Sequence, residues 1–360
     1  TLPSIAPGQT GVVALPWRDS LPGTAGPTHA PAPNGRPLWH VNVDVRLAAD
    51  TPWAPAGHAV SFEQFDVTAA TATRGQAAAG PAARAAAVAR AGEVEWPAGL
   101  SVSDDGLLVG SGDAPIIRGG IGNFFRATTG IDRGTGGESY ANDWYRAGLD
   151  RLERKVVSMT TGERVVVDAV YQVDGHTRFE QRSVYEPVGP DAIGVEETVV
   201  CDPALPVLPR IGVVYEVDPS LSRVEWLGRG PHESYCDRTL SARVGRYAGT
   251  VDDQHYPFIL PVECGGKEDV RWIALVDGTG RGVAFSSDIA FHASALRHSV
   301  AEYEAAQHGW DLATSDRIHV NLDHRHLGLG GDVGWYKCID EEYLIHPGTY
   351  RYRYIVRLVG

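Results

Sequence analysis

Residues 226–238 stand out in this chain, with the sequence Trp226-Leu227-Gly228-Arg229-Gly230-Pro231-His232-Glu233-Ser234-Tyr235-Cys236-Asp237-Arg238. The first residues resemble the end of a strand, and the Gly-Pro pair that follows marks a turn. Polar and aromatic residues then follow one another closely. Taken alone, this stretch predicts a rigid loop whose polar groups fix the backbone.

Segments on both sides of this loop alternate between apolar and polar residues, which predicts β-strands. The last of them, 350–358, sets tyrosines and aliphatic residues against arginines. Helical periodicity is confined to 142–154 and 299–307. Many short strands over 93–360 predict an all-β fold, one large antiparallel super-sandwich of two sheets. The other clear strand segments are 164–171, 211–217, 272–276 and 318–322.

The first 67 residues also have a β pattern. Residues 39–47 alternate cleanly, whereas 11–15 and 62–67 are weaker strand candidates. Three strands are too few for a closed sandwich of about seven, so residues 1–67 are expected to form a partial immunoglobulin-like sandwich. Residues 68–92 are rich in alanine and nearly lack large apolar side chains, which predicts a linker between this part and residues 93–360.

Composition excludes several classes of function. The chain has 32 Lys and Arg against 45 Asp and Glu, a net charge of −13, which argues against a nucleic-acid partner. No stretch approaches the roughly 18 apolar residues of a membrane helix, and no secretory signal is recognisable. The chain starts at Thr1, so we expect a trimmed start or a piece of a longer polypeptide. Its four cysteines form no C-x-x-C pair and are expected to be reduced, in a cytoplasmic protein.

The string W-x-G-x-G-P-x-E-x-Y-x-D-R at 226–238 resembles the signature of the large C-terminal sandwich domain of glycoside hydrolase family 2 β-galactosidases. The domain is similar to galactose mutarotases in fold. The resemblance covers nearly the whole chain, although Phe125 stands where the family usually has Trp. The other matching stretches are 251–272, the Gly-Gly-Asp loop at 321–335, the opening motif at 123–134, and, for the preceding immunoglobulin-like domain, 5–9 and 50–58.

The resemblance implies a retaining β-galactosidase, whose two glutamates lie on a (β/α)8 barrel. The family's barrel strings, S-L-G-N-E and C-E-Y-A-H, do not occur here. The chain is therefore expected to be a C-terminal part that has no catalytic residue, buttresses the barrel and is inactive alone. Its implied partners are the barrel domain or a separate large subunit, the β-galactoside and a possible homo-oligomer. Any Mg or Na of the assembled enzyme is expected on the barrel, with no cofactor on this chain.

Trp335 is the residue with the clearest chemical role. An indole face can stack on a pyranose ring, and neighbouring glycines let the loop approach closely. The resemblance implies that this Trp forms a substrate platform at the barrel mouth; from the residues alone, a core Trp is equally compatible. Further residues that could line the site are His326, Asp332, His232 and Glu233.

Other chemistry is conceivable for the polar residues. His324 and His326, two apart on a strand, could ligate a metal together with Asp323, but no third strong ligand is near in the sequence, so no metal is predicted. His232 and Glu233 could be an acid/base pair, although a loop-bracing network is favoured. The alternatives to the enzyme part are a purely structural domain and a stand-alone galactoside-binding or mutarotase-like module. The latter would need one of His232, His324 and His326 to act with Glu233 or Glu263.

Overall fold

The computed structural model describes residues 6, 8–14, 39–67, 96–110, 116–135, 137–313, 315–334 and 336–360. The predicted linker, 68–92, lies outside them. The chain divides into two units, Thr1–Val88 and Ala89–Gly360. Each unit is described by itself below.

The first unit contains a two-stranded antiparallel sheet of β1 (Trp39–Arg46) and β2 (Ala59–Val67). Both strands were predicted, and the partly buried residues of β1 alternate with exposed ones as the sequence pattern requires. The weaker candidate at 11–15 is wrong for its described residues, 11–14, which form no strand.

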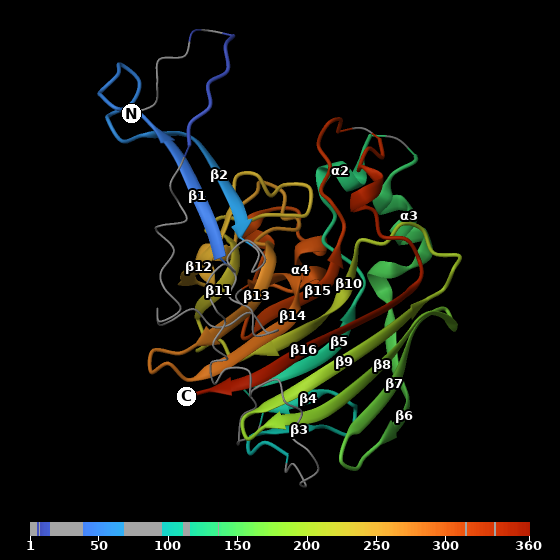
Figure 1. Ribbon diagram of the computed structural model, residues 1–360. Coiled ribbons are helices and arrows are strands. Elements are labelled where there is room, and N and C mark those ends of the chain that lie inside the picture. The colour runs from blue at the N-terminus through green and yellow to red at the C-terminus, as the bar shows by residue number, and fades with distance from the viewer. Residues whose placement is uncertain are drawn as a thin grey trace. The chain divides into compact units, whose positions relative to one another are not determined.

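The second unit is built on one antiparallel sheet of 14 strands (Figure 1). Its main path has the order β3-β4-β5-β10-β15-β14-β16-β9-β8-β7-β6, and β13, β11 and β12 continue from the other side of β14. The strands are β3 (Leu100–Val102), β4 (Leu108–Gly110), β5 (Ile117–Asn123), β6 (Glu153–Thr160), β7 (Val165–Val173), β8 (His176–Gly189), β9 (Ala192–Cys201), β10 (Arg210–Val217), β11 (Arg223–Gly230), β12 (Arg243–Thr250), β13 (Lys267–Val276), β14 (Gly282–Leu296), β15 (Ile318–His326) and β16 (Thr349–Val359).

The long strand β14 joins the parts of this sheet. Its first residues pair with β16 and its last residues with β15, while β13 follows its opposite edge. The sheet curls around a core to which β7, β9, β10, β11, β13, β14 and β16 contribute alternate side chains. The predicted all-β antiparallel fold is confirmed, and its strands form one continuous hydrogen-bonded sheet.

The helices are short: α2 (Gly130–Arg133), α3 (Tyr140–Ala147) and α4 (Val300–Ala305). The prediction of a helix at 299–307 is confirmed by α4, which Ser299 caps by accepting a hydrogen bond from the Glu302 amide. The predicted helix at 142–154 is wrong at its end. Gly148 adopts the left-handed conformation, with φ 76°, and stops α3. Single turns of 3-10 helix are η3 (Leu149–Arg151), η4 (Asp252–Gln254), η5 (Gly309–Asp311) and η6 (Glu341–Tyr343).

A β-bulge in β15 decides which side chains face the interior. Arg325 pairs with Ile211 of β10, but the next pair joins Asp323 to Gly212, so His324 is an extra residue. Asp323 and His326 are consequently both buried. Gly212 is required at this point, because a Cβ there would lie 2.1 Å from Asp323 Oδ1.

Candidate functional site

The signature loop is the part of the 226–238 motif that follows β11, residues 231–238. It is hydrogen-bonded to the residues just before β13 and to the start of that strand. Glu233 Oε2 accepts a 2.9 Å hydrogen bond from the Gly265 amide. The Ser234 amide donates to Gly266 O, and Ser234 Oγ accepts from the Glu268 amide. Glu233 therefore has the bracing role that the sequence favoured. His232 is exposed, and its Nε2 lies 2.9 Å from Ser241 Oγ, so the two side chains have different partners.

The same loop anchors residues 327–334, the described part of the Gly-Gly-Asp loop that follows β15. Asp237 Oδ2 accepts a 2.7 Å hydrogen bond from the Gly330 amide. Arg126, paired with Asp132 in the interior, donates to the carbonyls of Leu327 and Gly328. These contacts fix the start of the loop. Asp332 is exposed, and Trp335, the predicted sugar-stacking residue, lies outside the described residues.

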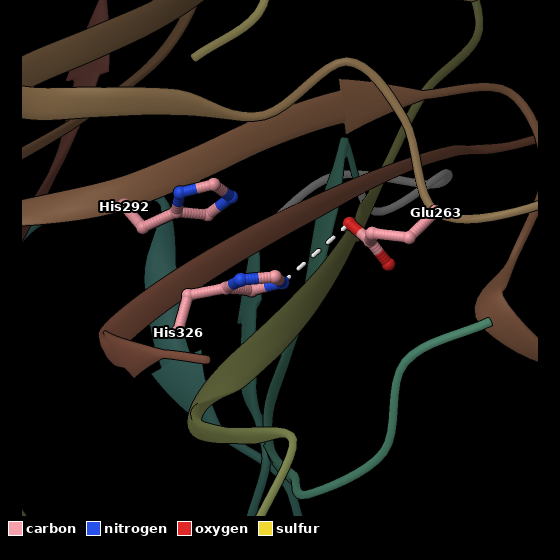
Figure 2. Close-up of side chains that lie close together, drawn as sticks. All are labelled: Glu263, His292 and His326. Atoms are coloured by element: carbon pink, nitrogen blue, oxygen red, sulfur yellow. Dashed lines mark ion pairs between the residues drawn. The ribbon is translucent and has the colours of Figure 1, made fainter. Parts of the chain in front are cut away.

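Three buried ligand-type side chains meet beneath these loops: His326 at the end of β15, His292 on β14, and Glu263 ahead of β13 (Figure 2). Their ligand atoms all lie within 4.8 Å of one another. The imidazole rings stack with centroids 4.3 Å apart, and His326 Nε2 lies 3.8 Å from Glu263 Oε1. Segments far apart in the sequence thus build one polar centre, which we call the histidine centre.

The Nδ1 atoms of both histidines have acceptors as neighbours. His326 Nδ1 lies 2.9 Å from Leu327 O, and His292 Nδ1 lies 2.7 Å from a carboxylate oxygen of Glu268. A carbonyl or carboxylate oxygen can only accept, so each Nδ1 carries the proton. In the neutral rings, each Nε2 then has a free lone pair. Both Nε2 atoms are buried without a hydrogen-bond partner.

Burial determines the charge state of this centre. It holds the pKa of His326 well below its ordinary value, and His292, Arg210 and Arg126 act in the same direction. Burial also raises the pKa of Glu263, an effect that Arg210 opposes. A neutral His326 beside a carboxyl group is the resulting arrangement.

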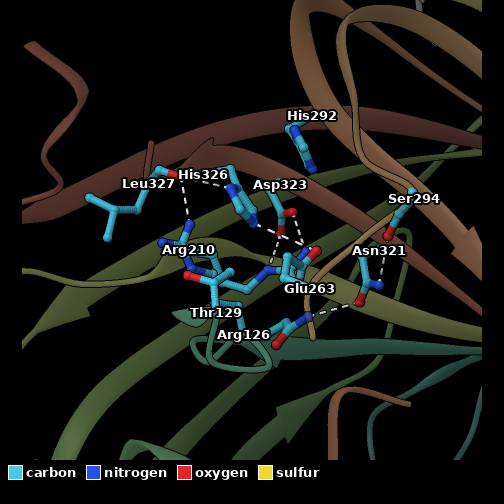
Figure 3. A network of polar contacts seen from close by, with 12 residues as sticks. Arg126, Thr129, Arg210, Glu263, His292, Ser294, Asn321, Asp323, His326 and Leu327 are labelled. Atoms are coloured by element: carbon cyan, nitrogen blue, oxygen red, sulfur yellow. Dashed lines mark hydrogen bonds and ion pairs between the residues drawn. The ribbon is translucent and has the colours of Figure 1, made fainter. Parts of the chain in front are cut away.

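Buried ion pairs surround the centre (Figure 3). Arg210 makes two hydrogen bonds to Asp323, at 3.1 and 2.5 Å, and both side chains are inaccessible to solvent. Arg210 Nη1 has no hydrogen-bond partner and lies 3.6 Å from Glu263 Oε2. Asn321 on β15 accepts a hydrogen bond from Asn123 at the end of β5 and donates one to Ser294 on the adjacent β14. Each arginine therefore has its own aspartate, and Glu263 is left to face the histidines.

A pocket of about 300 Å³ reaches the centre. Both histidines line it, as do Cys236 and His324. The bulge separates His324 from His326, and the ring of His324 stacks on Tyr352 instead, with centroids 5.2 Å apart. The proposed sharing of one face by His324 and His326 is therefore wrong, and His292 is the real neighbour of His326.

Two family models match the chain. One, described as beta galactosidase small chain, matches residues 104–358, and one described as beta-galactosidase domain 4 matches residues 1–68. The chain belongs to the beta galactosidase small chain family. This confirms the resemblance that the signature loop and the Gly-Gly-Asp loop indicated.

Curated relatives of this chain carry the name beta-galactosidase. The one from Priestia megaterium is 28% identical over 318 residues, which cover 85% of this chain and 30% of the relative. The one from Vibrio cholerae is 29% identical over 344 residues, which cover 89% of this chain and 32% of the relative. The chain thus spans about a third of the length of these relatives. A solved structure of a putative aldose 1-epimerase from Escherichia coli matches 57% of this chain and 68% of its own, with 11% identity and a TM-score of 0.30.

Only part of the histidine centre could be predicted from the sequence. His326 was predicted as a site residue, and Glu263 was considered only for the mutarotase-like alternative. His292 was not singled out, because a lone histidine in an apolar strand carries no local signal. Its role depends on strand order: His292 pairs with Asp323 across β14 and β15, and Arg210 pairs with His326 across β10 and β15.

Proposed function

We propose that this chain is the part of a β-galactosidase that supports the catalytic barrel and supplies a loop to the mouth of its active site. The observation that carries this proposal is the family match over 104–358, together with relatives named beta-galactosidase. In the assembled enzyme, two glutamates of the barrel would perform retaining hydrolysis of a terminal β-galactoside. The partner is the barrel domain or a large subunit.

Trp335 is proposed as the residue that contacts the substrate. The start of the loop that leads to it is held by partly buried Asp237 and by the buried Arg126–Asp132 pair. Asp332, exposed on the same loop, is proposed to line the site mouth.

We also propose a cytoplasmic location, with Mg or Na ions on the barrel. All four cysteines are free, as expected in a reducing compartment. Among the described residues, no helix is long and apolar enough to cross a membrane.

Hydrolysis of a chromogenic β-galactoside tests the proposal. The purified chain alone is expected to show no turnover, and addition of the barrel-bearing polypeptide of the same enzyme is expected to restore it. Turnover by the chain alone, lost on mutating one of its carboxylates, would place the chemistry here and contradict the proposal. A mutarotation assay with fresh α-galactose addresses the mutarotase-like alternative, since acceleration by the chain alone would favour it.

The role of Trp335 is tested in the reconstituted enzyme. Trp335→Ala is expected to raise KM about three- to tenfold, because it removes a stacking contact, and to change kcat less. The matched control is Trp310→Ala, which removes an exposed Trp elsewhere, 81% accessible in this chain. Equal kcat/KM for Trp335→Ala and the unmodified enzyme would show that Trp335 is no platform.

A further inference from the structure

We propose that Glu263, His292 and His326 bind a divalent transition-metal ion, with zinc as the ion that best suits two imidazoles and one carboxylate. This donor set is common in zinc sites that keep a fourth position open for water. The inference does not depend on the proposed function. It revises the prediction that this chain carries no metal, which was based on the lack of a third ligand for the pair His324 and His326.

The first argument is that the ligand atoms are unused. Buried polar atoms almost always have a hydrogen-bond partner, yet the Nε2 atoms of His292 and His326 have none. Their side chains are only 2% and 0% exposed. Both histidines and Glu263 form the one cluster of metal-ligand type found in the described part of the chain. A cation bound between the two Nε2 atoms and the Glu263 carboxylate would satisfy both lone pairs.

The second argument is the orientation of the rings. A metal-binding histidine typically donates its other ring N–H to a carboxylate or a backbone carbonyl, which fixes the tautomer and the ring plane. Both kinds of acceptor are present here. The Glu268 carboxylate accepts from His292 Nδ1, and the Leu327 carbonyl accepts from His326 Nδ1. Tyr235 packs against both rings, with centroid distances of 5.3 and 5.5 Å. The tautomer of each ring therefore leaves Nε2 free to act as a ligand. Because the stacked rings are only 19° from parallel, at least one ring must rotate to direct both lone pairs at one ion.

The third argument is charge. The two buried arginines, Arg126 and Arg210, are each neutralised by an aspartate. Neither Glu263 nor Glu268 has an arginine of its own among the residues that the structure describes. A bound divalent cation would stabilise the ionised form of both carboxyl groups. It would also offset the cost of burying Glu263, whose arginine neighbour, at 3.6 Å, lies beyond hydrogen-bond distance.

The distances between the ligand atoms also fit. Zinc–ligand bonds of about 2.0–2.2 Å place tetrahedral ligand atoms roughly 3.3 Å apart. His326 Nε2 and Glu263 Oε1 are 3.8 Å apart, and no pair of ligand atoms exceeds 4.8 Å, so the ligand atoms need to move little. The stacked imidazole rings must also rotate so that both lone pairs point to one ion. The pocket of about 300 Å³ that both histidines line brings solvent next to the two rings. Glu263 does not line this pocket and the Nε2 atoms are buried, so entry of an ion requires the rings to move.

The first test uses the unmodified 360-residue chain. After dialysis against EDTA, the chain is titrated with Co²⁺, whose visible absorption is intense in four-coordinate nitrogen–oxygen sites, and then with Zn²⁺ as competitor. One equivalent of Co²⁺ is expected to bind and to be displaced by Zn²⁺. Zn²⁺ should also raise the Tm, because it binds the folded state. Failure of the folded chain to bind either ion at micromolar concentrations would overturn the proposal.

Variants then locate the site. His292→Ala and His326→Ala are expected to weaken Co²⁺ binding on the order of 100-fold or more, and Glu268→Gln about 10- to 100-fold as a positioning residue. The matched control is His324→Ala, which lines the same pocket from the same strand and should bind normally. A loss in His324→Ala equal to that in His326→Ala would refute the assignment. If a histidine variant does not fold, the X-ray absorption spectrum of the Zn²⁺-loaded unmodified chain decides: fewer than two imidazoles per zinc overturns it.

Discussion

Two glutamates in the second unit, Glu197 and Glu263, are both buried, and their surroundings differ sharply. Glu197 lies on β9 and has three neutral donors: Ser183 and Gln181 at 2.7 and 3.0 Å, and Tyr354 at 3.2 Å. Glu263 lies in an irregular segment and faces Arg210 and His326 at 3.6 and 3.8 Å, beyond hydrogen-bond distance.

The difference separates a structural carboxyl group from one that is available to a ligand. Burying a carboxyl group is costly unless hydrogen bonds compensate, and Glu197 is compensated within the sheet. Around Glu263 the compensation is incomplete, because the nearby Nε2 atoms and Arg210 Nη1 remain without partners. Burial alone therefore does not mark a functional site, whereas burial together with unused polar atoms does.

The largest effect on the free energy of unfolding is expected from Asp323→Ala. This variant would remove the aspartate that pairs with Arg210 and keeps that arginine apart from Glu263. The change leaves Arg210 buried without its aspartate, and losing one partner of a buried pair costs about 3–5 kcal/mol of unfolding free energy. Chemical denaturation measures this. The control is Asp168→Ala, which removes the half-exposed partner of Arg182 and should cost less than about 1 kcal/mol. Similar losses for both variants would contradict the distinction.

A smaller effect, visible as pH dependence, is expected from Glu197→Gln. Burial raises the pKa of Glu197 from 4.5 to about 7, so the folded state favours the protonated form. The contribution of this group to the free energy of unfolding is therefore complete below about pH 4.5 and is lost as the pH rises to about 7. Unfolding free energies measured from pH 5 to 7.5 should show the unmodified chain losing up to about 1.4 kcal/mol per pH unit relative to Glu197→Gln.

The exposed neighbour Glu196 supplies the control for that experiment. Glu196→Gln should leave the pH dependence of the unmodified chain in place. If Glu197→Gln retained the same slope as Glu196→Gln, the buried carboxyl group would not be the origin of the effect.

The smallest effect on the free energy of unfolding is expected from Ser183→Ala, which removes one of the three hydrogen-bond donors of Glu197. The loss of a single buried hydrogen bond costs about 1 kcal/mol. Because the Ser183 hydroxyl lowers the pKa of Glu197, its removal should raise that pKa further. Denaturation midpoints at pH 5 and 7.5 measure both consequences. The loss of unfolding free energy is expected to be larger at pH 7.5, where Glu197 is more ionised, than at pH 5. A larger loss at pH 5 would contradict this.

Local patterns in the sequence predicted several strands of the second unit, namely β7, β10, β13, β15 and β16. Alternation along β7 and β16 could be recognised because the period of two is set within each strand. The end of α3 was missed, since Gly148 stops the helix although the residues beyond it continue a helical pattern. The bulge at His324 was also missed, because a register shift depends on the partner strand.

The candidate site could be predicted only in part, for the same reason. The signature loop identified the family, and the bracing role of Glu233 followed from its dense polar sequence. The meeting of His292, His326 and Glu263 depends on β14 lying beside β15 and on the clamped segment before β13. These contacts join residues tens of positions apart, which no local pattern encodes.

The shared strand β14 has a consequence for how the second unit can be divided. Because it pairs with β13, β15 and β16, cutting the chain within residues 287–290 would separate the half that pairs with β16 from the half that pairs with β15. Circular permutation or proteolytic nicking at that point should abolish folding, whereas the exposed turn between β13 and β14, residues 277–281, should tolerate new termini. The unit is therefore expected to unfold in a single cooperative transition.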